Sequence, residues 1–112
     1  EDGESEGEHA LFAVCARNLG KAHLRLGRGG AAVAAADLAI ERDPADGRAL
    51  HIRARGLRSQ GNLEGALKCL RAAVSAMKGI DALAAEMRQA RSAVLDVQED
   101  LRQRRESDRR LA

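Results

Sequence analysis

Apolar residues recur at helical spacing along most of the chain, and glycine-rich breaks interrupt this pattern. The breaks lie at residues 27–30, 43–47, 61–62 and 79. Glycine and proline end helices and occupy turns more often than other residues do. The pattern therefore predicts five helices, over residues 10–26, 30–42, 47–60, 63–78 and 80–111. Because the connections are short, consecutive helices should pack as antiparallel neighbours and form stacked helical hairpins.

The last predicted helix carries a narrow apolar seam. Its members alternate spacings of three and four residues: Ile80, Leu83, Met87, Ala90, Val94, Val97 and Leu101. Two interpretations fit this pattern, because the seam can cover the open end of the second hairpin or can form a dimeric coiled coil. Beyond Leu101 the same positions hold Arg104 and Asp108. The segment 80–112 should therefore be a capping helix whose last two turns, rich in basic residues, extend into solvent.

Composition favours an all-helical fold. Val and Ile are few, Thr is absent, and the chain has one Phe and neither Trp nor Tyr. Strands are enriched in β-branched and aromatic residues, whereas Ala, Leu, Arg and Glu favour helices. The predicted fold class is all-α, with two stacked helical hairpins and a long C-terminal capping helix.

The charges nearly balance, with 19 Lys and Arg against 17 Asp and Glu and a formal net charge of +2. Such a balance gives no general attraction to nucleic acid or to an anionic membrane. No apolar run reaches the roughly 20 residues of a membrane span, and the N-terminus lacks a signal-peptide pattern. We therefore expect a cytoplasmic protein with neither nucleic acid nor membrane as partner. Residues 1–9, with five acidic side chains and two glycines, are predicted to be a disordered leader.

Two parts of the chain come into register when Gly27 is aligned with Gly61. The same alignment pairs Ala32 with Ala66 and Ala39 with Ala73, and we call it the repeat register. The glycine falls in the turn of each predicted hairpin, and small residues two turns apart on one helix let a neighbouring helix come close. We therefore expect two repeats, over residues 13–46 and 47–80, in a unit that spans 10–79.

The repeat register resembles that of the tetratricopeptide repeat (TPR), a helical hairpin of about 34 residues. Leu19 and Gly20 stand where that repeat has its Leu-Gly pair. Ala32 and Ala39 take its two small positions, and Pro44 takes its terminal proline. The second unit keeps further positions of the pattern: Leu50, Ala54, Leu57, Gly61, Ala66, Leu70 and Ala73. The resemblance implies a fragment of an α-solenoid.

A closer resemblance is to the C-terminal TPR region of FKBP-type immunophilins, which are co-chaperones. It rests on residues 17–26, 49–54 and 106–111. The resemblance implies a peptide-binding module of a chaperone-associated immunophilin, with a peptidyl-prolyl isomerase domain elsewhere in a longer chain. It implies as partner the acidic C-terminal peptide of a heat-shock chaperone, such as heat-shock protein 90, or another protein.

The helix faces that packing leaves open predict a basic wall. If Leu19, Ala22 and Leu26 form the core stripe of the first helix, the neighbouring stripe and its equivalent on the third helix remain open. Stacked hairpins would bring these two stripes side by side, and an extended peptide rich in carboxylates would complement them. The predicted binding residues are Asn18, Lys21, Arg48, Arg55, Arg17 and Arg25. An ordinary solvated face is the alternative interpretation.

In the family that the chain resembles, five polar residues clamp the terminal carboxylate and an Asp side chain of the chaperone peptide. Asn18 matches the clamp Asn of the second repeat, and Arg48 stands where the third repeat has a Lys. Ile52 occupies the next clamp position, which is normally Arg, and the two clamp residues of the first repeat have no counterpart. The resemblance therefore implies a degenerate clamp.

The sequence contains no recognised catalytic or metal-binding motif, so we expect a non-catalytic segment without metal or cofactor. His23 is predicted to be a partly buried packing residue, and His9 to be exposed. Cys15 and Cys69 are predicted to be buried, reduced thiols.

Two other functions stay open at this point. One is a structural adaptor that assembles through its end surfaces or its last helix, and the other is a basic terminal helix that docks calmodulin or an anionic surface. Self-association is expected as well, because two repeats are fewer than the three that such arrays usually need. The first hairpin would then leave Leu11 and Phe12 without a neighbour.

Overall fold

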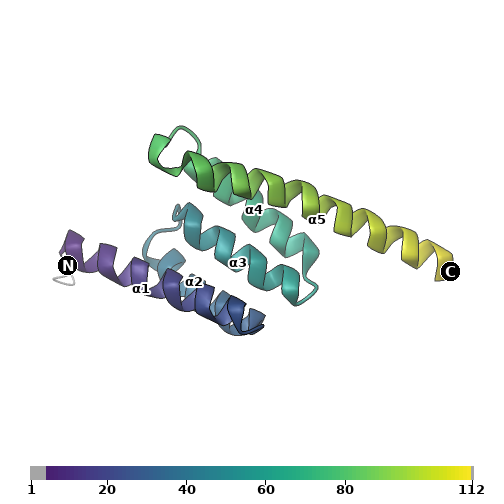
Figure 1. Ribbon diagram of the computed structural model, residues 1–112, viewed down its shortest axis with the longest axis horizontal. Helices are drawn as coiled ribbons and strands as arrows, with labels where there is room; N and C mark the ends of the chain where they lie inside the picture. The colour runs from purple at the N-terminus through teal and green to yellow at the C-terminus, as the bar shows by residue number, and fades with distance from the viewer. Residues whose placement is uncertain (1–4, 112) are drawn as a thin grey trace.

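The computed structural model describes residues 5–111, and these fold into helices alone. The helices are, in order, α1 (Glu6–Arg25), α2 (Gly29–Arg42), α3 (Gly47–Ser59), α4 (Leu63–Met77), a short 3₁₀ helix η1 (Asp81–Leu83) and α5 (Ala84–Leu111). The predicted all-α class is confirmed, and the helices lie close to the five predicted segments (Figure 1).

The N-terminal helix begins earlier than predicted. α1 starts at Glu6, and the Ser5 hydroxyl accepts a hydrogen bond from the backbone N–H of Glu8 at 3.2 Å. The prediction of a disordered leader is therefore wrong for residues 6–9, and its first part, residues 1–4, lies outside the described residues. A signal for this start is present in the sequence, because Ser followed three residues later by Glu is a capping-box pattern.

The turns after α1 and α3 have the same backbone structure at equivalent positions of the repeat register. Gly27 and Gly61 have φ angles of 72° and 83°, in the left-handed region that glycine adopts without strain. Arg28 N–H donates to the carbonyl of His23 at 2.8 Å, and Asn62 N–H donates to the carbonyl of Leu57 at 2.9 Å. These bonds satisfy carbonyl groups that a helix end would leave unpaired. Each glycine thus ends the first helix of its hairpin and allows the chain to turn into the second.

α2 and α4 bury matching positions of the repeat register. Ala32 and Ala66 are both 0% exposed, and Ala39 and Ala73 are 1% and 0% exposed. Because an alanine side chain is short, each of these helices can pack close to its neighbours.

α1, α3 and α5 lie side by side, with α2 and α4 behind them in the view of Figure 1. Each α-helix packs on the next, and α3 also contacts α1 and α5. The larger core clusters include Leu70, Met77 and Val97 of α4 and α5, which are at most 2% exposed. A smaller cluster around Ala16 joins α1 to α2 and α3. The core is therefore largest towards the C-terminal half of the stack.

α5 covers α4, as one of the two interpretations of its seam predicts. Ala90, Val97 and Leu101 are buried, whereas Ile80, which precedes the helix, is 46% exposed. Arg58 of α3 donates to Asp100 of α5 at 2.7 Å and so ties α5 to α3 as well. Beyond residue 104 α5 extends past the other helices into solvent (Figure 1).

The core stripe predicted for the first helix is wrong. Leu19 and Leu26 are 48% and 63% exposed, whereas Ala16 and Gly20 are buried. A Cβ added at Gly20 would lie 2.8 Å from Cγ2 of Ile52, so α1 approaches α3 too closely for a large side chain at this point. Small residues rather than leucines make the contact.

The two cysteines differ in their surroundings. Cys69 is buried, as predicted, but Cys15 is exposed, and both are free thiols. The prediction of burial fails for Cys15 because it lies on a side of α1 that no described helix covers.

Candidate functional site

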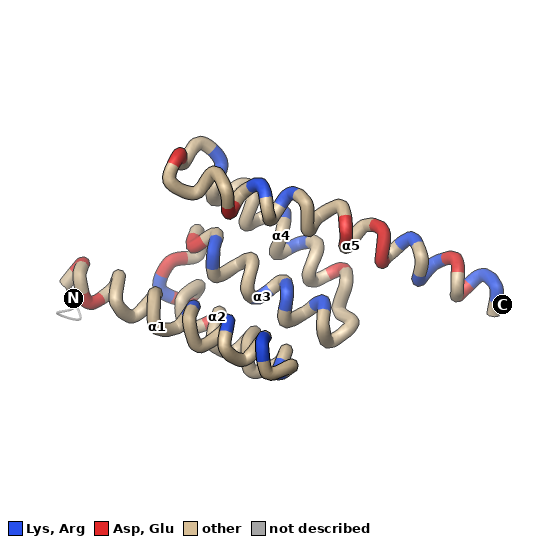
Figure 2. Tube along the Cα trace, viewed as in Figure 1, with Lys and Arg blue, Asp and Glu red and all other residues tan. Residues whose placement is uncertain are grey.

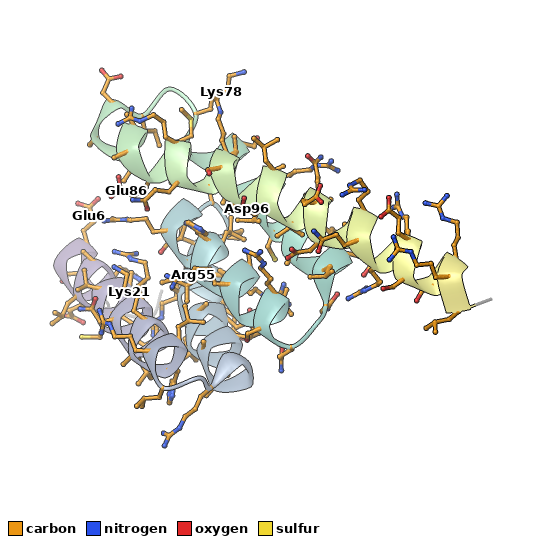
Figure 3. All side chains as sticks on the ribbon, turned by 45° about the vertical axis from the view of Figure 1, so that its right-hand side comes forward. Glu6, Lys21, Arg55, Lys78, Glu86 and Asp96 are labelled. Carbon is orange, nitrogen blue, oxygen red and sulfur yellow. The ribbon has the colours of Figure 1, made fainter. Side chains whose placement is uncertain are left out.

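Exposed basic side chains follow the open sides of α1 and α3. They are Lys21 and Arg25 on α1, and Arg48 and Arg55 on α3. Lys21 and Arg55 stand at equivalent positions of the repeat register and come from neighbouring helices (Figure 3). None of the four forms an ion pair within residues 5–111. We call the surface that they line the basic groove.

Asn18 lies at the edge of the basic groove. It is exposed, one helical turn from Lys21. The structure thus leaves five of the six predicted binding residues accessible, and the amide of Asn18 adds a donor and an acceptor to four cations.

Arg17 is the exception, and its predicted place on the open wall is wrong. Its guanidinium Nη1 donates to Oδ2 of Asp46 at 2.6 Å, and the two side chains are 10% and 7% exposed. Oδ1 of Asp46 also accepts the backbone N–H of Ala49 and so caps the start of α3. Arg17 therefore holds α1 to the beginning of α3 and has little surface left for a ligand.

Ile52, which stands at a clamp position of the family that the chain resembles, does not face the basic groove either. It is 3% exposed and packs next to Gly20 of α1. An Arg at this position would have to bury its charge between two helices, which is unfavourable without a partner. The degenerate clamp could not be completed by a single substitution there.

A cavity of about 710 Å³ lies between the start of α1 and the start of α3, and it shares Arg48 with the basic groove. Its lining includes Glu6, His9 and Val14 of α1, Arg48 of α3 and Leu83 of η1. Glu6 and His9 lie in the segment that was predicted to be a disordered leader, so their contribution to a site was not predicted. His9 is exposed, as predicted.

α5 contributes acidic side chains on the side that faces α3. Asp100 accepts the hydrogen bond from Arg58 of α3, and Asp96 lies one turn earlier on the same side of the helix. Glu86 is half-buried near the beginning of α5 (Figure 3). Figure 2 shows the resulting contrast, with basic positions along α1 and α3 and acidic ones in the middle of α5. The basic wall was predicted from the sequence, whereas the acidic side of α5 was not.

Two histidines, His23 and His51, are partly buried. Burial lowers the pKa of His51, and the charge of Arg55 one turn away lowers it further. His51 is therefore neutral at neutral pH and adds no charge to the basic groove. His23 is half-buried, and its Nδ1 atom is buried without a hydrogen-bond partner, in keeping with the predicted packing residue.

Residues 5–111 contain no group of three or more His, Cys, Asp or Glu side chains that could hold a metal ion. Within the same residues, every helix is too short or too polar to cross a membrane. No protein-family model matches the sequence, and a search of curated proteins finds no relative.

Proposed function

We propose that this chain is a protein-interaction module of the tetratricopeptide type, which acts in the cytoplasm and binds an extended acidic peptide in the basic groove. The observation that carries the proposal is the set of four exposed cations, without ion-pair partners, on two adjacent helices of a chain whose net charge is only +2. Such side chains recognise carboxylates through charge-assisted hydrogen bonds.

The repeated backbone supports the assignment to this type of module. The equal turns at Gly27 and Gly61 and the equal burial of matching alanines in α2 and α4 are expected of stacked helical hairpins, whose open helix faces form a binding surface. The resemblance to immunophilin co-chaperones makes the acidic terminal peptide of a heat-shock chaperone the first candidate ligand. With only Asn18 and Arg48 of the five clamp residues retained, such a peptide should bind weakly.

The acidic side chains of α5 limit which peptides are expected to bind. A peptide that directs a carboxylate to Arg48 and Arg55 would have Asp96 on the opposite wall. A basic or neutral residue in that part of the peptide is therefore favoured, whereas a uniformly acidic peptide would meet repulsion from α5.

Calorimetric titration with an acidic peptide that ends in a free carboxylate tests the proposal. Replacement of Lys21 and Arg55 together by Ala should weaken binding roughly 10-fold or more, because two accessible cations are lost. Amidation of the peptide's C-terminus and higher salt should each weaken binding as well. The matched control replaces Arg71 and Arg91, exposed cations of α4 and α5 that line a different surface.

The control variant should bind the peptide as the wild type does. Equal losses in both double variants would mean that the peptide responds only to net charge. Absence of binding by the wild type to free-acid and amidated peptides alike would reject the proposal.

A further inference from the structure

One apolar side of α1 is not covered by any other helix within residues 5–111. Leu11, Leu19 and Leu26 on this side are 64%, 48% and 63% exposed, and Cys15 is exposed between them. We call this surface, with Asn18 and Ala22, the end face. It adjoins the basic groove and shares Asn18 with it, but Cys15 and the three leucines lie outside the groove, so a dimer through them can form whether or not a peptide binds there.

The equivalent side of α3 is covered by the first hairpin. Ala49 and Ile52, the counterparts of Cys15 and Asn18, are 0% and 3% exposed. Arg53, the counterpart of Leu19, donates to Asp37 of α2 at 2.8 Å. On α3, which is covered, these three positions hold two buried side chains and one ion-paired arginine. On α1 the same three positions are exposed.

A further hairpin could not stack on α1 as α2 stacks on α3. α2 and α3 come close together at Gly56, where an added Cβ would lie 2.7 Å from the backbone carbonyl oxygen of Gly29. The counterpart of Gly56 is Ala22, which has that Cβ. The end face therefore suits a helix that packs at a greater distance, with interlocking side chains.

The end face has the same order of residue sizes from either end. Leucines lie at both ends, small residues lie inside them, and Asn and Leu lie at the centre: Leu11, Cys15, Asn18, Leu19, Ala22 and Leu26. The pattern is symmetric about the midpoint between Asn18 and Leu19. An interface between two identical chains related by a two-fold axis requires this self-complementarity.

Charges at the ends of α1 favour an antiparallel pair. The first turn is acidic, with Glu6 and Glu8, and the last turn is basic, with His23 and Arg25. In an antiparallel pair each acidic end would lie beside the basic end of the other copy, whereas a parallel pair would bring like charges together.

We propose that two copies of this chain dimerise through the end face, with their α1 helices antiparallel about a two-fold axis between Asn18 and Leu19. Leu11 then packs against Leu26 of the partner subunit, and Cys15 lies opposite Ala22 of the partner subunit. The contact extends over about 22 Å of helix. An Asn beside the axis favours a single register, as polar residues do in paired helices.

Sedimentation equilibrium of the wild type and of Leu19→Glu tests the dimer. The wild type should dimerise, and Leu19→Glu should raise the dissociation constant about 30-fold or more, since it places two carboxylates beside the axis. Leu95→Glu is the matched control, because Leu95 is 67% exposed and lies on a different surface, formed by α4 and α5. A wild type that stays monomeric at high concentration, or equal effects of the two variants, would overturn the proposal.

Disulfide trapping tests the register. In Ala22→Cys, oxidation should join Cys15 of one subunit to the new cysteine of the other, and peptide mapping should find this pair in both halves of the dimer. The control Ala34→Cys places a cysteine at an exposed position of α2 and should give no such link. A link between the two Cys15 residues in place of the expected pair would contradict the register, and with it the proposed interface.

Discussion

α1 and α3 hold the same place in two hairpins of one backbone plan, yet their side chains face different surroundings. The turns that end them repeat, with glycine in the left-handed region in each. Cys15 is nevertheless exposed where Ala49 is buried, and Asn18 is exposed where Ile52 is buried. α3 lies between α1 and α2 on one side and α4 and α5 on the other, whereas α1, among the described helices, packs only on α2 and α3. The repeated backbone therefore sets how the helices are arranged. Whether an equivalent side chain is buried or exposed depends on which helices lie next to it.

The junction between the hairpins should be the most sensitive point. Asp46→Ala removes the cap of α3 and leaves the buried guanidinium of Arg17 without its carboxylate. Breaking one side of a buried pair costs about 3–5 kcal/mol, so the free energy of unfolding in urea should fall by about that amount.

Asn62→Ala is the matched control for this variant. Asn62 also caps a helix, through a hydrogen bond from the N–H of Gly65 at 2.9 Å, but it holds no buried cation. Loss of a cap alone should cost about 1 kcal/mol. Equal losses in the two variants would show that the Arg17 pair adds nothing to the junction.

Equivalent positions in α2 and α4 should respond alike to overpacking. Ala32→Leu and Ala66→Leu each enlarge a side chain at a position that is 0% exposed. Each should reduce the free energy of unfolding by about 1–3 kcal/mol. Ala85→Leu, at an exposed position of α5, should change it little. A large loss at one of the two buried positions and none at the other would break the equivalence of the hairpins.

His51, the counterpart of Arg17 in the second hairpin, should give the smallest effect. Its pKa in the folded chain is lowered by burial and by Arg55, so below pH 6.5 the unfolded chain binds the proton more readily than the folded chain. The free energy of unfolding should therefore decrease as pH falls from 7 towards 5. His51→Gln should reduce this slope in urea titrations at several pH values, and an unchanged slope would contradict the assignment.

Apolar periodicity and the glycine-rich breaks predicted the five helices, and composition predicted the all-α class. The breaks mark helix ends because Gly27 and Gly61 occupy conformations that other residues adopt with strain. The burial pattern of α1 was not predictable in the same way. The hydrophobicity of Leu19 suggested that it is buried. Because α1 lies so close to α3, only the small residues Ala16 and Gly20 fit in the contact.

The candidate site was predicted in part, for a related reason. Exposed positions such as Lys21 and Arg55 follow from helical spacing within one segment. The burial of Arg17 depends on Asp46, which lies in the connection to the second hairpin, and the acidic side of α5 depends on how that helix docks. Contacts between distant segments leave no periodic signal in the sequence.

The most direct test of the proposed function is a residue-resolved NMR titration of the backbone amides with an acidic peptide that ends in a free carboxylate. Shift changes should concentrate around Lys21 of α1 and around Arg48 and Arg55 of α3, and should saturate with one dissociation constant. Changes spread over all exposed cations, with Arg71 and Arg91 moving as much as the basic groove does, would contradict the assignment of this surface as the binding site.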